Sequence, residues 1–134
     1  MKSIQPKTAK GPGEWFTGDV YPTIIVTGEG PSKVRVGSVH FAPGARTAWH
    51  AHAVGQYPHI MEGTAFVQER GGKLQVLRAG ETIYTAPGIE HWHGASPDSF
   101  MVRLAVWEAP TDSTPETTWG NHVTDDEYNE QLGE

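Results

Sequence analysis

Residues 44–63 have the sequence GARTAWHAHAVGQYPHIMEG, and this stretch decides the fold. Histidine stands at His50 and again at His52, with one residue between them. On a β-strand, side chains at positions i and i+2 point to the same face. The two imidazoles therefore enter the same space, and we predict that this pair forms half of a metal site.

A second histidine pair follows later in the chain. Residues 80–95 have the sequence GETIYTAPGIEHWHGA, with one residue between His91 and His93. A lone buried histidine is usually a hydrogen-bonded core residue, but two matched pairs favour a shared ligand. We predict that two neighbouring strands direct these pairs onto one divalent ion.

The composition favours a small all-β domain. Its 37% of hydrophobic residues suffice for one core, and no apolar run approaches the roughly 20 residues that cross a bilayer. The 16 glycines and 10 prolines divide the chain into short segments, which favours brief strands over long helices. We expect a single domain over residues 1–134, with an N-terminal arm at 1–13 and an acidic C-terminal segment at 111–134.

Charge and cysteine content narrow the possible partners. A net charge of −6 argues against binding to nucleic acid or to an anionic membrane. The chain has no cysteine, so only histidine, carboxylate and amide groups can bind a metal. Residues 1–13 lack the apolar core of a signal peptide, and a cytoplasmic location is expected.

Short β-rich runs recur along the chain, each bounded by glycine, proline or charge. They lie at residues 23–27, 34–41, 47–52, 65–69, 74–77, 82–85 and 101–108. Gly71 and Gly72 separate two of them and predict a tight hairpin. A short terminal helix is expected at 125–132, capped by Thr124. A meander or Greek-key barrel fits these spacings.

The first histidine stretch resembles the first cupin motif. Gly44, five residues, His50, one residue, His52, three residues, Gln56, six residues and Gly63 reproduce its spacing, and most cupins carry Glu where this chain has Gln56. The resemblance implies an all-β cupin barrel, a double-stranded β-helix or jelly roll. Glycines let the chain turn sharply at the barrel ends.

Residues 80–95 resemble the second cupin motif, with the proline displaced by one position and Ala95 in place of the usual Asn. Sixteen residues, 64–79, separate the motifs, which is typical of compact single-domain bacterial cupins. The implied metal ligands are His50, His52, Gln56 and His91. Their donors are neutral, so the ion keeps a charge near +2 and a high Lewis acidity.

Further blocks resemble the manganese-dependent bacterial cupin hydroxynitrile lyases. They are residues 10–12, 15–18, 43–50, 55–56, 91–95 and 122–125. Members of this family are carbon-carbon lyases, which reversibly cleave a cyanohydrin into an aldehyde or ketone and hydrogen cyanide. The resemblance implies manganese as the cofactor, and nitrogen and oxygen donors also suit Fe, Ni, Zn or Cu.

The same resemblance assigns roles around the ion. His93 is implied to be a catalytic base or proton shuttle, or else a support for the ligands, and Thr47 to orient a substrate oxygen, or else to form a turn. An implied substrate pocket, which ordinary barrel packing would also explain, contains Gly37, Val39, Ile60, Phe66, Met101 and Trp107.

One position departs from the lyase pattern. Where that family carries a polar histidine on the late strand, this chain has Arg103. Strand alternation places Arg103 on one face with Met101, Ala105 and Trp107. Arginine cannot act as a base near neutral pH, but it can bind a carboxylate or cyanide, or pair with an acidic neighbour.

Three classes of function remain open. The first is a cyanohydrin lyase, and the second is another small-molecule enzyme such as a dioxygenase, isomerase or decarboxylase. The third is a non-catalytic cupin that binds a ligand or metal. A homodimer or homotetramer is expected, because the out-of-phase residues of the late strand form an apolar outer face, namely Phe100, Val102, Leu104 and Val106.

Overall fold

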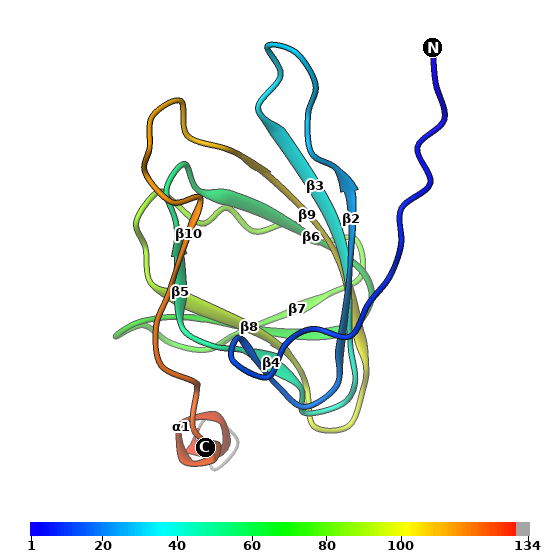
Figure 1. Cartoon of the computed structure of the whole chain (residues 1–134). Helices are drawn as coiled ribbons and strands as arrows, with labels where there is room; N and C mark the ends of the chain where they lie inside the picture. Colours follow the sequence, from blue (N-terminus) through cyan, green and yellow to red (C-terminus); the bar gives the residue numbers. More distant parts are fainter. Residues whose placement is uncertain (131–134) are drawn as a thin grey trace.

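The computed structural model describes residues 1–130 and shows an antiparallel β-barrel with one short helix (Figure 1). The elements are β1 (Phe16–Thr17), β2 (Val20–Val26), β3 (Val34–Phe41), β4 (Arg46–Thr47), β5 (His50–His52), β6 (Gln56–Glu69), β7 (Gln75–Arg78), β8 (His91–Ala95), β9 (Met101–Glu108), β10 (Thr117–Trp119) and α1 (Asp125–Glu130).

Strand β6 joins the two sides of the barrel. On one side the strand order is β2-β3-β9-β6, and on the other β6 pairs with β7 and with β8. Strand β8 then pairs with β4 and β5, and β10 extends this side by pairing with β5. The interior between the two sides holds the four histidines of the two motifs.

A bulge and a glycine let β6 pass from one side to the other. The register against β9 shifts between Ile60 and Glu62, so one extra residue stands in β6. Gly63 follows with φ of 79°, and a Cβ there would lie 1.8 Å from the carbonyl oxygen of Phe100. Only glycine fits that position without moving the backbone. This explains the glycine that ends the first histidine motif.

The bulge also inverts the alternation of β6. Ile60 before it and Ala65 and Val67 after it all pack in the interior cluster, so inward positions change from even to odd numbers. Phe66 therefore points outward, towards Trp92. The resemblance implied that Phe66 lies with Ile60 on the pocket wall, but the bulge interrupts the period of two between these residues.

Two apolar clusters stabilise the fold. The interior cluster contains Val20, Val39, Phe41, Ala45, Ile60, Ala65, Val67, Leu77, Ala95 and Met101. The outer cluster lies between the outside of β6 and β8 and the C-terminal segment, and it contains Trp49, Phe66, Trp92, Val123 and Tyr128. The C-terminal segment thus covers an apolar part of the barrel wall.

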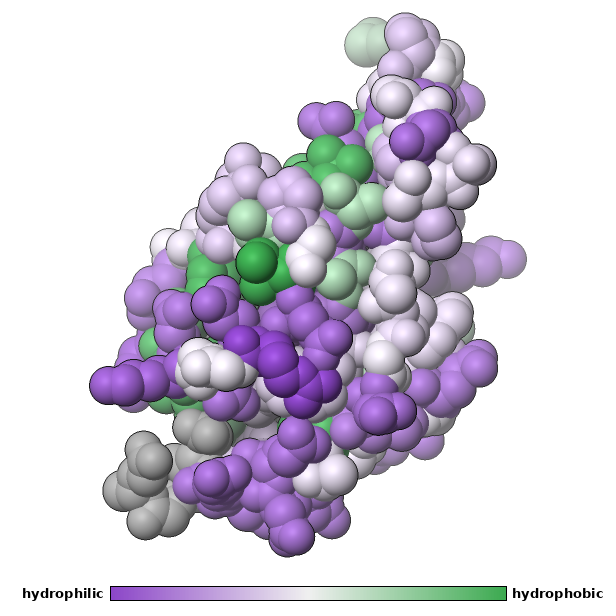
Figure 2. All heavy atoms as spheres, turned by 90° about the vertical axis from the view of Figure 1, so that its left-hand side faces the viewer, coloured by the Kyte–Doolittle hydropathy of each residue, from purple (hydrophilic) through white to green (hydrophobic). Residues whose placement is uncertain are grey.

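Specific hydrogen bonds hold that segment in place. Thr124 Oγ1 accepts from the Glu127 amide at 3.0 Å, and the Glu127 carboxylate accepts from the Thr124 amide at 3.0 Å, which is a capping box. The Tyr128 hydroxyl donates to the Ala95 carbonyl at 2.6 Å. Figure 2 shows hydrophilic surface at the level of α1 and hydrophobic surface higher on the same face.

The N-terminal arm runs beside β2. Thr8 forms a bridge with Thr23, and the Gly11 amide donates to the Val20 carbonyl at 2.7 Å. Among residues 1–130, no helix is long and apolar enough to cross a membrane.

The prediction of an all-β fold with a short C-terminal helix is confirmed. Strands at 34–41 and 101–108 have the predicted bounds, because their alternating β-branched residues pair over their full length. The first half of β6 was not predicted, and residues 82–85 form only isolated bridges to β6. The helix begins at Asp125 as predicted, and the predicted helical positions 131 and 132 lie outside the described residues.

Candidate metal centre

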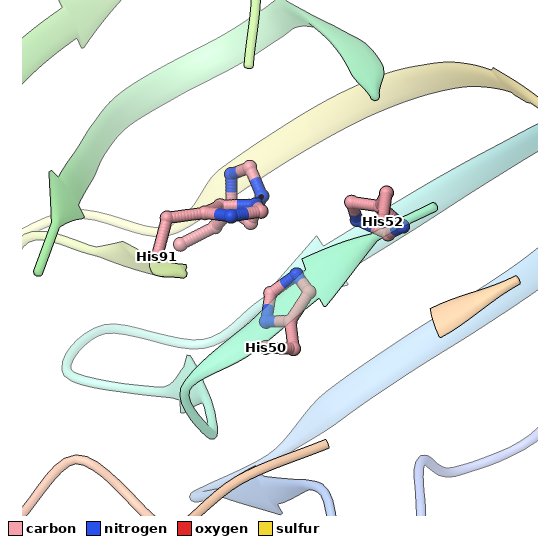
Figure 3. Close-up of side chains that lie close together, drawn as sticks. His50, His52 and His91 are labelled. Atoms are coloured by element: carbon pink, nitrogen blue, oxygen red, sulfur yellow. Dashed lines mark hydrogen bonds between the residues drawn. The ribbon is translucent and has the colours of Figure 1, made fainter. Parts of the chain in front are cut away.

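Four histidines converge inside the barrel. His50 and His52 lie on β5, His91 and His93 lie on β8, and the two strands pair at His50 and His91. One ring nitrogen from each of the four lies within 4.8 Å of the others. Figure 3 shows the labelled rings of His50, His52 and His91 facing a common space. Their convergence agrees with the expectation from the i, i+2 spacing.

Backbone carbonyls orient two of the rings. The Nδ1 of His50 lies 2.9 Å from the Ala48 carbonyl oxygen, and the Nδ1 of His91 lies 2.8 Å from that of Ile89. A carbonyl only accepts, so each Nδ1 carries the proton and each Nε2 keeps a free lone pair. In metal sites, the ring N–H that does not face the ion commonly donates to a carbonyl in this way, and this bond fixes the tautomer that binds the metal.

Several buried nitrogen and oxygen atoms around the rings have no hydrogen-bond partner in residues 1–130. They include His52 Nε2, His93 Nδ1 and the amide oxygen of Gln56. Leaving a buried polar atom unsatisfied costs about 1–3 kcal/mol, and protein cores rarely tolerate several together. The donor set is nitrogen with one oxygen, which suits a divalent transition metal. His50, His52, His91 and His93 are thus able to hold an ion, and the Gln56 oxygen lies in the same pocket.

Burial keeps the imidazoles neutral. Together with nearby His91 and Arg103, it lowers the pKa of His52 to about 3. It also lowers the pKa of His91 to about 4, against a raising effect of the bond to the Ile89 carbonyl. The pKa values of His50 and His93 are held well below their usual range for the same reason. Neutral imidazole is the form that binds metals.

His93 and Thr47 lie next to each other on neighbouring strands. His93 is fully buried, and its Nε2 lies 2.9 Å from the Nε2 of His91. Thr47 Oγ1 accepts a hydrogen bond from the His93 backbone amide at 3.1 Å, so it holds β4 against β8. Thr47 is not among the residues that line the pocket. This placement gives the hydroxyl a positioning task and does not support the predicted contact with substrate.

Arg103 points into the same space from β9. Its side chain is buried, with 6% exposure, and its Nε and Nη1 have no hydrogen-bond partner in residues 1–130. Its Cζ lies 5.5 Å from the centre of the Phe41 ring. Burial lowers the pKa of the guanidinium to about 10, so it remains charged near neutral pH. The inward direction agrees with the strand alternation.

A pocket of about 600 Å³ opens beside the histidines. Gly37, Val39 and Trp107 line it, together with His50, His52, Gln56 and Arg103. Ile60 and Met101, which the resemblance also assigned to the pocket, do not line it and are fully buried in the interior cluster.

Phe66 was predicted to line the pocket, and the structure corrects this. Its ring lies 5.9 Å from that of Tyr128, on the outside of the barrel wall. The bulge in β6 is the physical reason.

Sequence reasoning missed the aromatic rim of the pocket. Trp15 and Trp119 stack with ring centres 5.1 Å apart, and Trp119 lies 4.8 Å from the ring of His50. Phe16 approaches Trp119 at 6.1 Å, and all three line the pocket. They come from opposite ends of the chain, so no local pattern joins them. The available sequence signals were the five tryptophans of the chain and the resemblance of residues 15–18 to the lyase family.

The N-terminal arm forms part of the pocket wall, which the sequence did not indicate. Lys7, Ala9, Lys10 and Pro12 line the pocket beside β2. Glu116 also lines the pocket, and its carboxylate pairs with Arg35 at 3.1 Å and accepts from Trp107 Nε1 at 3.2 Å. The arm therefore contributes to the shape and charge of the opening.

Comparison with known proteins agrees with this site. A family model described as a cupin domain matches residues 37–107, which is more than half of the chain. The chain belongs to the cupin family. This cupin is 39% identical over 121 residues to the (R)-mandelonitrile lyase of Granulicella tundricola, and the match covers 90% of this chain and 91% of that protein.

Solved structures resemble this cupin over most of its length. A cupin-like protein from Thermotoga maritima superposes with a TM-score of 0.87 and 36% identity, covering 97% of each chain. A cupin-2 domain from Rhodospirillum rubrum gives a TM-score of 0.69 at 14% identity, covering 98% of this chain and 82% of that one. The latter likeness concerns the fold alone. The small cupin barrel is thereby established.

Proposed function

We propose that this cupin is a metal-dependent lyase that cleaves and forms small cyanohydrins. The observation that carries the proposal is the set of buried, neutral imidazoles beside a pocket with unsatisfied donors. The 39% identity to a mandelonitrile lyase over most of both chains supports it. The products would be hydrogen cyanide and an aldehyde or ketone.

The proposed ligands are His50, His52, Gln56 and His91, with manganese as the expected ion. Fe, Ni, Zn and Cu suit the same donors. When bound, a divalent ion supplies Lewis acidity that makes a substrate hydroxyl easier to deprotonate. The Gln56 oxygen is neutral, so the protein would not reduce the charge of the ion as a glutamate would.

His93 is the proposed proton carrier. Its ring is neutral and its Nδ1 has no partner in the described chain, so this atom can hold a proton. In the cleavage direction the hydroxyl loses its proton, the carbon-carbon bond to the nitrile breaks, and its electron pair leaves with cyanide. The proton then passes to cyanide, which balances the reaction.

The pocket walls favour an aromatic substrate. Trp15, Trp107 and Trp119 present aromatic faces around the opening, and Val39 adds an aliphatic surface. Aromatic rings pack against one another in offset or edge-on geometry, and each such contact contributes about 0.5–1.5 kcal/mol. An aryl cyanohydrin matches these walls better than a purely aliphatic one.

A release assay tests the lyase. The metal-loaded protein is mixed with mandelonitrile, and cyanide and benzaldehyde are both measured. We expect release well above that of His50→Ala, which lacks an expected ligand, and of His93→Asn, which lacks the proposed proton carrier. His59→Ala serves as the matched control, because His59 bonds to Thr82 away from the pocket. Equal rates for the wild type and His50→Ala would refute the proposal.

A second candidate is an enzyme that acts on a carboxylate substrate, such as a decarboxylase or isomerase. The buried, unpaired guanidinium of Arg103 favours it, because an acyclic or aromatic acid would supply the missing anion. A screen of small acids for product formation, with oxygen uptake measured in parallel for iron-loaded protein, separates this candidate from the lyase.

We also propose that the chain forms a homodimer or homotetramer. Exposed aromatic side chains on the outer face support this, since the rings of Tyr57 and Tyr84 stack at 4.9 Å and are 53% and 56% exposed. Light scattering on the purified protein tests it, and a monomer at micromolar concentration would refute it.

A further inference from the structure

Two buried arginines differ in what surrounds them. Arg46 and Arg103 are 5% and 6% exposed. Arg46 donates to the Val123 carbonyl through Nε and Nη2 and pairs with Asp125 at 2.7 Å. Arg103 has no ion pair with any carboxylate of residues 1–130, and two of its three nitrogens lack any partner. A buried charge without a partner is costly, so it is normally kept for a ligand.

The direction of Arg103 identifies where that ligand would lie. On β9, Arg103 stands opposite Val39 of β3 and Ile60 of β6, which both face the interior. Arg103 lines the same pocket as His50, His52 and Gln56. Arg103 therefore borders a space that a small molecule can reach from the opening.

The charges around the pocket do not compensate Arg103. Histidine and glutamine side chains carry no negative charge, so His50, His52 and Gln56 cannot neutralise the guanidinium. Glu116 is the one acidic residue of the lining in the described chain, and its carboxylate is already bound by Arg35 and Trp107. Lys7 and Lys10 add positive charge to the rim, although Lys10 pairs with Asp19 at 3.1 Å. A bound divalent ion would add more. The charge of Arg103 therefore has no free counter-charge in the pocket lining of the described chain, and a bound anion would supply one.

We propose that Arg103 forms an anion-binding subsite inside the pocket, and that it takes the carboxylate of a small aromatic acid. A guanidinium can give two parallel N–H bonds to a carboxylate, and such charge-assisted bonds are roughly twice as strong as neutral ones. The aromatic rim of Trp15 and Trp119 accommodates the aryl part of the same molecule. The subsite shares its pocket with the proposed lyase but does not depend on lyase activity.

Calorimetric titration of the full-length protein with matched probes tests the subsite. The probes are mandelate, which carries a carboxylate, and 1-phenyl-1,2-ethanediol, which is of similar shape and neutral. Both are titrated at constant ionic strength, with the protein as purified and again after chelation. We expect mandelate to bind at least about ten-fold more tightly than the diol, as one charge-assisted bond implies. Equal affinities would overturn the proposal.

Variants assign the preference to Arg103. Arg103→Gln is expected to lose the ten-fold preference, and Arg103→Lys to retain part of it, because lysine keeps the charge without the planar fork. Arg78→Gln makes the same change of charge at an exposed position of β7 and is expected to keep the full preference. Circular dichroism checks that each variant folds. If Arg103→Gln does not fold, the affinities of the wild type for mandelate and for the neutral diol still decide whether the pocket prefers an anion.

Two further measurements test other causes of the preference for mandelate, namely the metal ion and a general affinity for anions. If the preference for mandelate disappears after chelation, the ion and not Arg103 holds the carboxylate, and the proposal fails. Thiocyanate, which stays ionised near neutral pH, is titrated as a second anion on the chelated protein, and its binding without binding of mandelate would overturn the carboxylate assignment. Absence of cyanide release from mandelonitrile, with mandelate still preferred, would refute the lyase and leave the subsite standing.

Discussion

The two faces of the barrel wall at β8 differ in how far their buried polar groups are satisfied. Outside, Trp92 donates to the Gln68 side chain at 3.0 Å, and the Tyr128 hydroxyl and Arg46 guanidinium also have partners. Inside lie five of the six buried side-chain atoms that have no partner in residues 1–130. The Nε1 of Trp49, in the outer cluster, is the sixth.

This difference in hydrogen bonding indicates a structural role for the outer face and a ligand-binding role for the inner face. The outer face is closed by the chain itself, since the C-terminal segment supplies both apolar contacts and hydrogen-bond partners. The inner face leaves donors open, and that arrangement costs stability unless a ligand supplies the partners. The proposed function of this cupin therefore lies where most of the unpaired buried polar atoms are found.

The largest expected effect is on the inner face. Replacing His91 by Ala should lower metal affinity by about 100-fold or more, because even residues behind the ligands of a metal site contribute 10–100-fold. Competitive titration against a coloured chelator, with elemental analysis, measures it. His59→Ala is the control. A His91→Ala protein that retains one tightly bound ion would contradict the proposed centre.

The same titration distinguishes the two candidates for the fourth ligand. Gln56 is implied by the motif, whereas His93 belongs to the cluster of four histidines. We expect Gln56→Ala to weaken binding more than His93→Ala.

On the outer face, replacing Arg46 by Met should lower the free energy of unfolding by about 2 kcal/mol. The Val123 carbonyl would lose both of its side-chain donors and remain buried. Urea unfolding of the metal-free protein, followed by circular dichroism, measures the change. An unchanged free energy of unfolding would show that the outer face does not depend on this arginine.

On the inner face, the same substitution of an arginine by Met should change the free energy of unfolding in the opposite direction. Replacing Arg103 by Met removes a buried charge without a partner, so the free energy of unfolding should rise by about 1–2 kcal/mol. The same urea experiment applies, and Arg103→Lys, which keeps the charge, should show no gain. If Arg103→Met loses as much stability as Arg46→Met, the contrast between the faces is wrong.

The smallest effect concerns a single hydrogen bond. Tyr128→Phe removes the donor to the Ala95 carbonyl while keeping the ring, and it should cost about 1 kcal/mol. Burial raises the pKa of this phenol to about 12, so the hydroxyl remains a donor across the neutral range. Urea unfolding measures the cost, and metal binding should not change. A loss of metal affinity would show that the two faces are coupled.

Local patterns in the sequence predicted the parts of the protein that depend on neighbouring residues. The i, i+2 histidine pairs, the strands at 34–41 and 101–108 and the cap at Thr124 all follow from backbone periodicity within a few residues. The inward direction of Arg103 belongs to the same group. These features need no knowledge of distant partners.

Only the tertiary structure decided the rest. The bulge in β6 placed Phe66 outside, because one extra residue inverts every later side chain. The rim of Trp15 and Trp119 joins residues from the two ends of the chain. The sequence places Arg103 on a predicted strand and Arg46 just before one, and the fold alone decides which of the two finds a partner. Long-range pairing determines that difference, because a buried charge depends on what surrounds it in space.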